Sequence, residues 1–312
     1  MTLRIFITGY LGYIGTSLSY IITQNYKICD IYGYDLLENN DILDYDKLKN
    51  AMIAYEPHVV IHLAAASSIT QCNNNVMEAI KINALGTRNV INAMKASGCI
   101  NIIYASTSSV YGSSNGKAFT ETSISHPNSH YAYSKLLGEH VIMNEKDINY
   151  IIFRMFNVVG NSGNAEIDAV IKPGYDRLFT ALKSGNITIY GNKYRTYDGT
   201  CERDYVSLKD TCMAYLLAIN HLATTKKQVC EILNVCTGIP ISVLKLVKHW
   251  NNQVYDLLET NKKYRGNLVE YSIGESRAGD PALVYGSNEK IYRVLHWKPS
   301  KNMDDIIYDL LI

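Results

Sequence analysis

Residues 3–23, "LRIFITGYLGYIGTSLSYIIT", predict the fold of the amino-terminal part of the chain. Residues 3–8 form an apolar run that ends at a glycine, which is typical of a buried strand, and apolar residues at helical spacing follow the glycines. Between the two, Gly9, Gly12 and Gly15 form a G-x-x-G-x-x-G loop. Such a loop lets backbone N–H groups approach a pyrophosphate at a helix N-terminus. The stretch therefore predicts a dinucleotide-binding fold.

An acidic residue at the end of the second predicted strand indicates which dinucleotide binds. Asp35 ends the strand 28–35, twenty residues after Gly15. A carboxylate there accepts hydrogen bonds from the ribose hydroxyls of NAD and repels the additional phosphate of NADP. No arginine adjoins it. The glycine spacing differs from G-x-G-x-x-G, and an aspartate that only caps the strand stays the alternative, but together the features predict NAD.

Apolar runs that alternate with helical patterns predict the rest of the fold. Strands are expected at 3–8, 28–35, 57–65, 100–106 and 149–156, with a helix at 77–97 between the third and the fourth. Alternation of this kind predicts an α/β fold with a Rossmann-type, doubly wound parallel sheet.

The character of the sequence changes after residue 160. A Gly/Asn-rich loop is expected at 160–168 and a helix at 175–185, followed by short strands and helices. We therefore expect an NAD-binding domain of residues 1–165, to which later segments return, and a smaller α/β substrate-binding domain of residues 166–312.

The composition excludes several classes of protein. Of the 312 residues, 47% are hydrophobic, and the net charge is +1. The hydrophobic fraction is high enough for the chain to bury a core. The net charge is too small to create an electrostatic field that would attract nucleic acid or an anionic membrane. The amino terminus does not read as a signal peptide, and no apolar run approaches the ~20 residues that span a bilayer. The seven cysteines are scattered without metal-ligand spacing, so we expect reduced thiols, no metal site and a cytoplasmic location.

The segment "SHYAYSKLLGEH", residues 129–140, carries the predicted chemistry. Tyr131 and Lys135 lie four positions apart, so they share one face of a helix. A tyrosine has a pKa of about 10, and bringing it near 7 takes roughly 4 kcal/mol. A buried ammonium, together with a positively charged nicotinamide ring, could supply that preference. We predict that Tyr131 is the acid/base and that Lys135 assists it, the alternative being an ordinary amphipathic helix.

With the glycine loop, this pair resembles the extended short-chain dehydrogenase/reductase superfamily, in its nucleotide-sugar-modifying branch. In "YASTSSVYG" (104–112), Thr107 matches that family's catalytic hydroxyl, which implies hydrogen bonds to the reacting sugar hydroxyl and to Tyr131. The dehydratases and decarboxylases of the branch carry acidic residues where this chain has Ser108 and Ser109. A serine hydroxyl cannot replace a carboxylate as acid or base at neutral pH. Oxidation at C4 of a sugar, with return of the hydride, is the reaction that remains.

Three further segments are similar to the UDP-glucose (UDP-galactose) 4-epimerase family. They are "IYGNKYRTYDGTCERDY" (189–205), "RMFNVVG" (154–160) and "SRAGDP" (276–281). The resemblance implies an NAD-dependent isomerase that epimerises a UDP-hexose at C4 through a transient 4-keto sugar, as a homodimer. A 4-ketosugar reductase stays an alternative, and so does a non-catalytic NAD-binding sensor.

The resemblance also implies which residues make up the site. The catalytic residues are Thr107, Tyr131 and Lys135. The other cofactor-binding residues are Gly9, Gly12, Tyr13, Ile14, Gly15, Asp35, Asp41, Ile42, Leu63, Ala64, Ala65, Asn83 and Met155. The other substrate-binding residues are Phe156, Asn157, Tyr190, Arg203, Arg277, Asp280 and Val284. In this assignment the two arginines bind the diphosphate, Asp280 a ribose hydroxyl and Tyr190 the uracil.

The sequence departs from the family pattern at a few positions. Ser67 stands where these epimerases commonly have a lysine, and Ser207 where they have a histidine. Val284 matches a pocket position at which a tyrosine excludes an N-acetyl group. Its smaller side chain implies that UDP-GlcNAc and UDP-GalNAc are accepted too, unless the neighbouring Tyr285 fills the same space.

Overall fold

In the computed structural model the chain folds into two compact units. The residues that the structure describes are 2–26, 28–170, 177–260, 262, 264, 266–277 and 279–312. Unit 1 comprises residues 1–111, 124–155 and 212–233, and unit 2 comprises residues 112–123, 156–211 and 234–312. The chain thus passes between the units several times.

Unit 1 is built on a six-stranded sheet with the order β2-β1-β3-β4-β5-β9. Its strands are β1 (Leu3–Thr8), β2 (Cys29–Tyr34), β3 (Val59–His62), β4 (Asn101–Thr107), β5 (Asn149–Met155) and β9 (Cys230–Val235), the last of which ends in unit 2. Each neighbouring pair among β1 to β5 runs parallel. This order and direction confirm the predicted Rossmann-type sheet.

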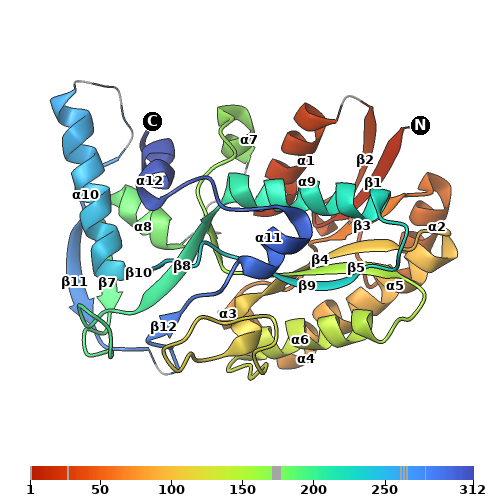
Figure 1. The fold of residues 1–312 in the computed structure, drawn as a ribbon, viewed down its shortest axis with the longest axis horizontal. Coiled ribbons are helices and arrows are strands. Elements are labelled where there is room, and N and C mark those ends of the chain that lie inside the picture. The colour runs from red at the N-terminus through yellow and green to blue at the C-terminus, as the bar shows by residue number, and fades with distance from the viewer. Residues whose placement is uncertain are drawn as a thin grey trace. The chain divides into compact units, whose positions relative to one another are not determined.

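Helices cover both faces of this sheet, with α1 and α9 on one and α2, α5 and α6 on the other (Figure 1). The helices are α1 (Tyr13–Asn25), η1 (Leu36–Glu38), α2 (Tyr45–Tyr55), α3 (Ile69–Asn74), α4 (Val76–Ile80), η2 (Lys81–Gly86), α5 (Thr87–Ala96), η3 (Ser108–Tyr111), α6 (His130–Met143) and α9 (Leu208–Thr224). On one face, Met52, Val90 and Ile142 from three helices pack on Phe6 and Ile102 of the strands. Burial of such side chains stabilises the sheet by about 1.5–3 kcal/mol each.

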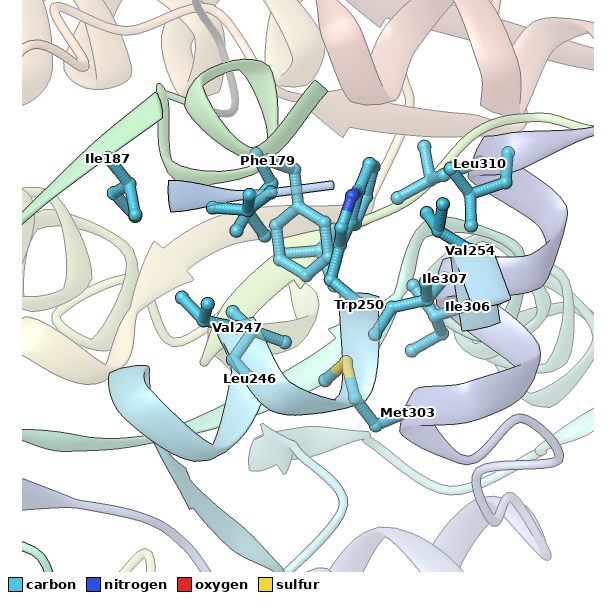
Figure 2. Close-up of a cluster of buried hydrophobic side chains, with 14 of the residues drawn as sticks. Phe179, Ile187, Leu246, Val247, Trp250, Val254, Met303, Ile306, Ile307 and Leu310 are labelled. Carbon is cyan, nitrogen blue, oxygen red and sulfur yellow. The ribbon is translucent and has the colours of Figure 1, made fainter. Parts of the chain in front are cut away.

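Unit 2 contains shorter strands and its own core. Its elements are β6 (Asn157–Val159), α7 (Ala165–Val170), α8 (Arg177–Ser184), β7 (Asn186–Tyr190), β8 (Glu202–Ser207), β10 (Pro240–Ser242), α10 (Val243–Glu259), β11 (Glu270–Gly274), β12 (Leu283–Val284), α11 (Glu289–Leu295) and α12 (Met303–Leu311). Strand β8 pairs with β6, β10 and β12, and β7 pairs with β11. Figure 2 shows the core around Trp250 of α10, where Phe179 and residues of α12 gather.

The elements differ from expectation in three places. The predicted helix at 77–97 is interrupted by the π-helical turn η2, which separates α4 from α5. The segment 160–168, expected as a loop, contains the start of α7. Helix α2 was not predicted at all. Residues 175 and 176 of the helix expected at 175–185 lie outside the described residues.

Candidate active site

The loop between β1 and α1 depends on its glycines for close backbone packing. Gly9 has a φ of +72°, and a Cβ there would lie 2.6 Å from the backbone nitrogen of Ala64. A Cβ on Gly15 would lie 2.4 Å from the carbonyl oxygen of Gly9. At Gly12, by contrast, a Cβ would meet one atom among the described residues, Gly9 O at 3.2 Å. The space beside the Gly12 Cα is therefore open, so a pyrophosphate can approach this turn closely.

Asp35 ties this loop to the end of β2. Its side chain is buried, and one carboxylate oxygen accepts from Leu11 N at 3.1 Å while the other accepts from Leu37 N at 3.0 Å. The Tyr10 hydroxyl makes a second link by donating to Glu38 Oε1 at 2.6 Å. Each carboxylate oxygen of Asp35 has a further lone pair, so it can still accept from a ribose hydroxyl.

The Asn83 side chain links two segments of unit 1 by hydrogen bonds. Its side chain accepts from Ala66 N at 2.9 Å and donates to Ala66 O at 3.0 Å and to Ser134 Oγ at 2.8 Å. These bonds tie the loop after β3, which includes Ala64 and Ala65, to helix α6. Sequence reasoning assigned Asn83 to the cofactor, whereas the structure shows its amide engaged with the protein.

The other residues of the predicted cofactor set lie near the same ends of the strands or in the core. Leu63 N donates to Thr8 O at 3.0 Å, so the loops after β1 and β3 lie side by side. Tyr13 and Ile14 begin α1, and Met155 ends β5. Asp41 caps the following turn by accepting from Leu43 N at 2.9 Å. Ile42 is buried in the core of unit 1, where it packs on Gly86.

Helix α6 presents the predicted catalytic pair. Its N-cap, Ser129, accepts from Ala132 N, which starts the helix immediately before Tyr131. Thr107 ends β4, and its hydroxyl lies close enough to the Tyr131 phenol to lower the pKa of that phenol. The Thr107 hydroxyl oxygen also accepts from Ser109 N at 3.1 Å, which fixes its orientation. Thr107, Tyr131 and Lys135 therefore lie together in unit 1.

Lys135 is buried, and its side-chain nitrogen makes no hydrogen bond or ion pair with the described residues. Only 2% of the residue is exposed, and its Nζ lies 4.1 Å from the ring centroid of Tyr104. No residue in the described part of the chain accepts a hydrogen bond from this ammonium or forms an ion pair with it. Burial lowers the pKa of Lys135 to about 7, against the opposing effects of the Glu139 carboxylate and of Cys72. Its donors are thus free for a bound hydroxyl.

The electrostatics of Tyr131 differ from the expectation. Burial raises the pKa of Tyr131 to about 12, the nearby Thr107 hydroxyl lowers it, and Cys72 raises it. Lys135 is not among the groups that shift this pKa. The protein's own groups therefore do not make Tyr131 a phenolate at neutral pH.

A buried ionic network, which sequence reasoning missed, anchors the catalytic helix. Glu139, one turn past Lys135, accepts from Arg154 Nη2 at 2.6 Å and from its Nε at 3.1 and 3.2 Å. Ser106, next to Thr107, also donates to Glu139. The side chains of the ion pair are 0% and 5% exposed, so α6 is fixed to the ends of β4 and β5 by a desolvated charge pair. In the sequence, the only indication of this role is that Glu139 lies four residues after Lys135, one helical turn further along α6.

Unit 2 brings together four residues of the predicted substrate set. Arg203 on β8 forms an ion pair with Asp280, and Arg277 covers one face of the Tyr190 ring with its guanidinium carbon 3.8 Å from the ring centroid. Tyr190 is 41% exposed. Pairing of β7 with β11 places Tyr190 beside Gly274, close to the segment that carries Arg277. Two guanidinium groups on neighbouring segments suit a diphosphate.

The remaining predicted substrate residues are mostly inaccessible. Val284 on β12 is 9% exposed and pairs with Arg203 of β8, and Phe156 is buried with its ring against Gly286. Tyr285 is partly buried. Asn157 at the start of β6 is exposed, so its amide is available to a ligand.

The two serines that depart from the family pattern have different surroundings. Ser207 is buried at the start of α9, where its hydroxyl donates to Asp210 Oδ2 at 2.8 Å and accepts from Asp210 N at 2.9 Å. It therefore serves as a helix cap. Ser67 is exposed on the loop after β3.

Comparison with known proteins identifies the family. Residues 5–236 match the NAD dependent epimerase/dehydratase family. The chain belongs to this family. It is 30% identical over 257 residues to the UDP-glucose 4-epimerase of Lactobacillus helveticus, covering 80% of this chain and 74% of that protein. It is 28% identical over 340 residues to the enzyme of the same name from Mycoplasma genitalium, covering 98% and 94%.

A solved structure shows the same fold. The UDP-glucose 4-epimerase from Stenotrophomonas maltophila, crystallised with NAD and formylated UDP-arabinopyranose, aligns with a TM-score of 0.86 at 23% identity, over 99% of this chain and 96% of that one. These matches confirm the predicted superfamily, the UDP-glucose 4-epimerase family and NAD as the cofactor of an isomerase.

The residues present fit the family's cofactor. The open space beside Gly12 can accommodate a pyrophosphate, the Asp35 carboxylate can accept from a ribose, and the unpartnered Lys135 ammonium can donate to one. In the described part of the chain, no group of three or more His, Cys, Asp or Glu side chains is placed to hold a metal. No helix formed by the described residues has the length and apolar character needed to cross a membrane.

Proposed function

We propose that the chain catalyses the 4-epimerisation of a UDP-hexose, interconverting UDP-glucose and UDP-galactose through a transient 4-keto sugar. In this proposal unit 1 holds NAD and the catalytic residues, and unit 2 binds the UDP portion. The curated relatives named UDP-glucose 4-epimerase support this assignment.

One observation carries the proposal: Thr107 at the end of β4 lies close to Tyr131 and Lys135 of α6, with no acidic side chain in the turn that follows Thr107. Ser108 and Ser109 form that turn, and Ser109 is bound to Thr107 through its backbone and its hydroxyl. Elimination of water or loss of carbon dioxide needs a carboxylate acid or base there. The arrangement supports proton transfer to and from one sugar hydroxyl.

The residues of unit 1 then have distinct roles. When NAD is bound, its nicotinamide ring would supply the acceptor and donor of the C4 hydride. Tyr131 removes the proton from the C4 hydroxyl and later returns it, while Thr107 orients that hydroxyl. The Gly12 backbone, Asp35 and Lys135 hold the cofactor. Since burial raises the pKa of Tyr131 to about 12, proton removal needs positive charge beyond what the protein supplies.

The direct test is incubation of the purified protein with UDP-galactose without added dinucleotide. We expect UDP-glucose to form with no net oxidation or reduction, detected by chromatography or NMR. A requirement for stoichiometric NADH or NADPH would instead indicate a ketosugar reductase. Absence of any conversion by protein that contains NAD would refute catalysis.

We further propose that the N-acetylated pair, UDP-GlcNAc and UDP-GalNAc, is accepted. The smaller side chain of Val284 supports this. Replacing Val284 with tyrosine should lower turnover of the N-acetylated pair at least tenfold more than turnover of the plain hexoses. Val284→Leu is the matched control, because it adds little bulk. Turnover of the plain hexoses alone by the unmodified enzyme would contradict the proposal.

A cytoplasmic homodimer completes the proposal. Met77 of α4, Leu85 of η2 and Tyr133 of α6 are 74%, 57% and 48% exposed, on helices that pack together within unit 1. Exposed apolar side chains on neighbouring elements are typical of protein interfaces. Light scattering should give twice the 35.1 kDa mass of the chain, and a monomer at micromolar concentration would contradict this.

A further inference from the structure

Tyr194 lies in the loop between β7 and β8, inside unit 2. A Cβ on Gly191 would lie 2.7 Å from Cε2 of the Tyr194 ring and 2.9 Å from Cβ of Ser276. The Tyr194 ring and Ser276 therefore both pack against Gly191, which directly follows Tyr190 at the end of β7, and Ser276 directly precedes Arg277. Residues 191–194 and 273–276 line a cavity of about 520 Å³ there.

The Tyr194 hydroxyl is buried and has no hydrogen-bond partner among the described residues. Leaving a buried hydroxyl without a hydrogen-bond partner is unfavourable. The Tyr194 hydroxyl therefore lowers the stability of the ligand-free protein relative to a phenylalanine at the same position. A ligand that accepts a hydrogen bond from this hydroxyl removes that destabilisation.

The charges around this hydroxyl indicate the kind of partner. Burial raises the pKa of Tyr194, Asp280 and Cys201 add to the rise, and the nearby Arg203 and Arg277 oppose it, so the phenol stays protonated and can donate. Guanidinium groups have donors only. A ligand that satisfies two guanidinium groups and a phenol together must be rich in acceptors and negatively charged.

We propose that Tyr194 is a further substrate-binding residue, whose hydroxyl donates to an oxygen of the diphosphate that Arg203 and Arg277 bind. The inference rests on the proposed function, because the diphosphate is that of the nucleotide-sugar. It assigns a role to a residue that neither the motifs nor the resemblance singled out.

The test is Tyr194→Phe in the NAD-containing enzyme, with UDP and uridine as separate probes in calorimetry. We expect UDP to bind roughly tenfold more weakly, since a hydrogen bond to a charged group is lost, while uridine binding stays unchanged. Because the substitution removes an unpartnered hydroxyl, the thermal midpoint of the UDP-free enzyme should stay the same or rise.

Tyr197→Phe is the matched control, since Tyr197 lies in the same loop with its side chain fully exposed. It should change neither UDP affinity nor stability. Three outcomes overturn the inference: UDP affinity of Tyr194→Phe within twofold of the unmodified enzyme, equal losses for UDP and uridine, or a lowered thermal midpoint. Failure of the unmodified enzyme to bind UDP would refute the proposed function itself and the inference with it.

Discussion

Replacing Tyr131 with phenylalanine is expected to lower turnover by roughly 10²–10⁴-fold while NAD stays bound. The substitution removes one hydroxyl, the one that lies close to Thr107, and leaves the ring packing in place. The glycine loop and Asp35, which we expect to hold the cofactor, are untouched. Steady-state kinetics and the NAD content of the purified variant are the measurements.

Tyr133→Phe is the matched control for this prediction. Tyr133 lies in the same helix, two residues on, and is 48% exposed. Its loss of a hydroxyl should leave turnover within twofold of the unmodified enzyme. If Tyr131→Phe kept near-normal turnover, Tyr131 would not be the acid/base.

Glu139→Gln is expected to destabilise the folded protein by about 3–5 kcal/mol. Glutamine keeps the size of the side chain but removes its charge, so the Arg154 guanidinium stays buried without a counter-charge. The pair is desolvated, with side chains 0% and 5% exposed and an N–O distance of 2.6 Å. Denaturant titration and the thermal midpoint are the measurements.

The surface pair of Arg4 and Glu56 provides the control. Their atoms lie 3.3 Å apart, and the Glu56 side chain is 71% exposed. Water screens such a pair, so Glu56→Gln should change the free energy of unfolding by less than about 1 kcal/mol. Equal effects of Glu139→Gln and Glu56→Gln would show that the buried network does not anchor the catalytic helix.

The elements of unit 1 could be predicted because their signals are local. A strand that ends just before Gly9 and a helix that begins just after Gly12 appear in the sequence as an apolar run and a helical period. Helix α2 escaped because only Leu48 and Met52 of its residues are buried, which leaves a weak apolar pattern. The π-helical turn η2 inside the helix expected at 77–97 has no sequence signal of its own.

Motif residues could be predicted at the site, but their partners could not. The spacing of Tyr131 and Lys135 specifies a shared helix face, whereas the pairing of Glu139 with Arg154 depends on how far α6 lies from β5. The effect of burial could not be predicted from the spacing either. Burial raises the pKa of Tyr131, against the expectation, and lowers the pKa of Lys135. The unpartnered hydroxyl of Tyr194 likewise becomes visible only when every neighbour is placed.

The most direct measurement follows the hydrogen at C4 of the sugar. UDP-galactose carrying deuterium at C4 is converted in ordinary water, and the isotope content of the UDP-glucose formed is measured by mass spectrometry and NMR. If hydride leaves C4 and returns to the same carbon, the product keeps its deuterium at C4 almost completely. Loss of the label to solvent would contradict this account.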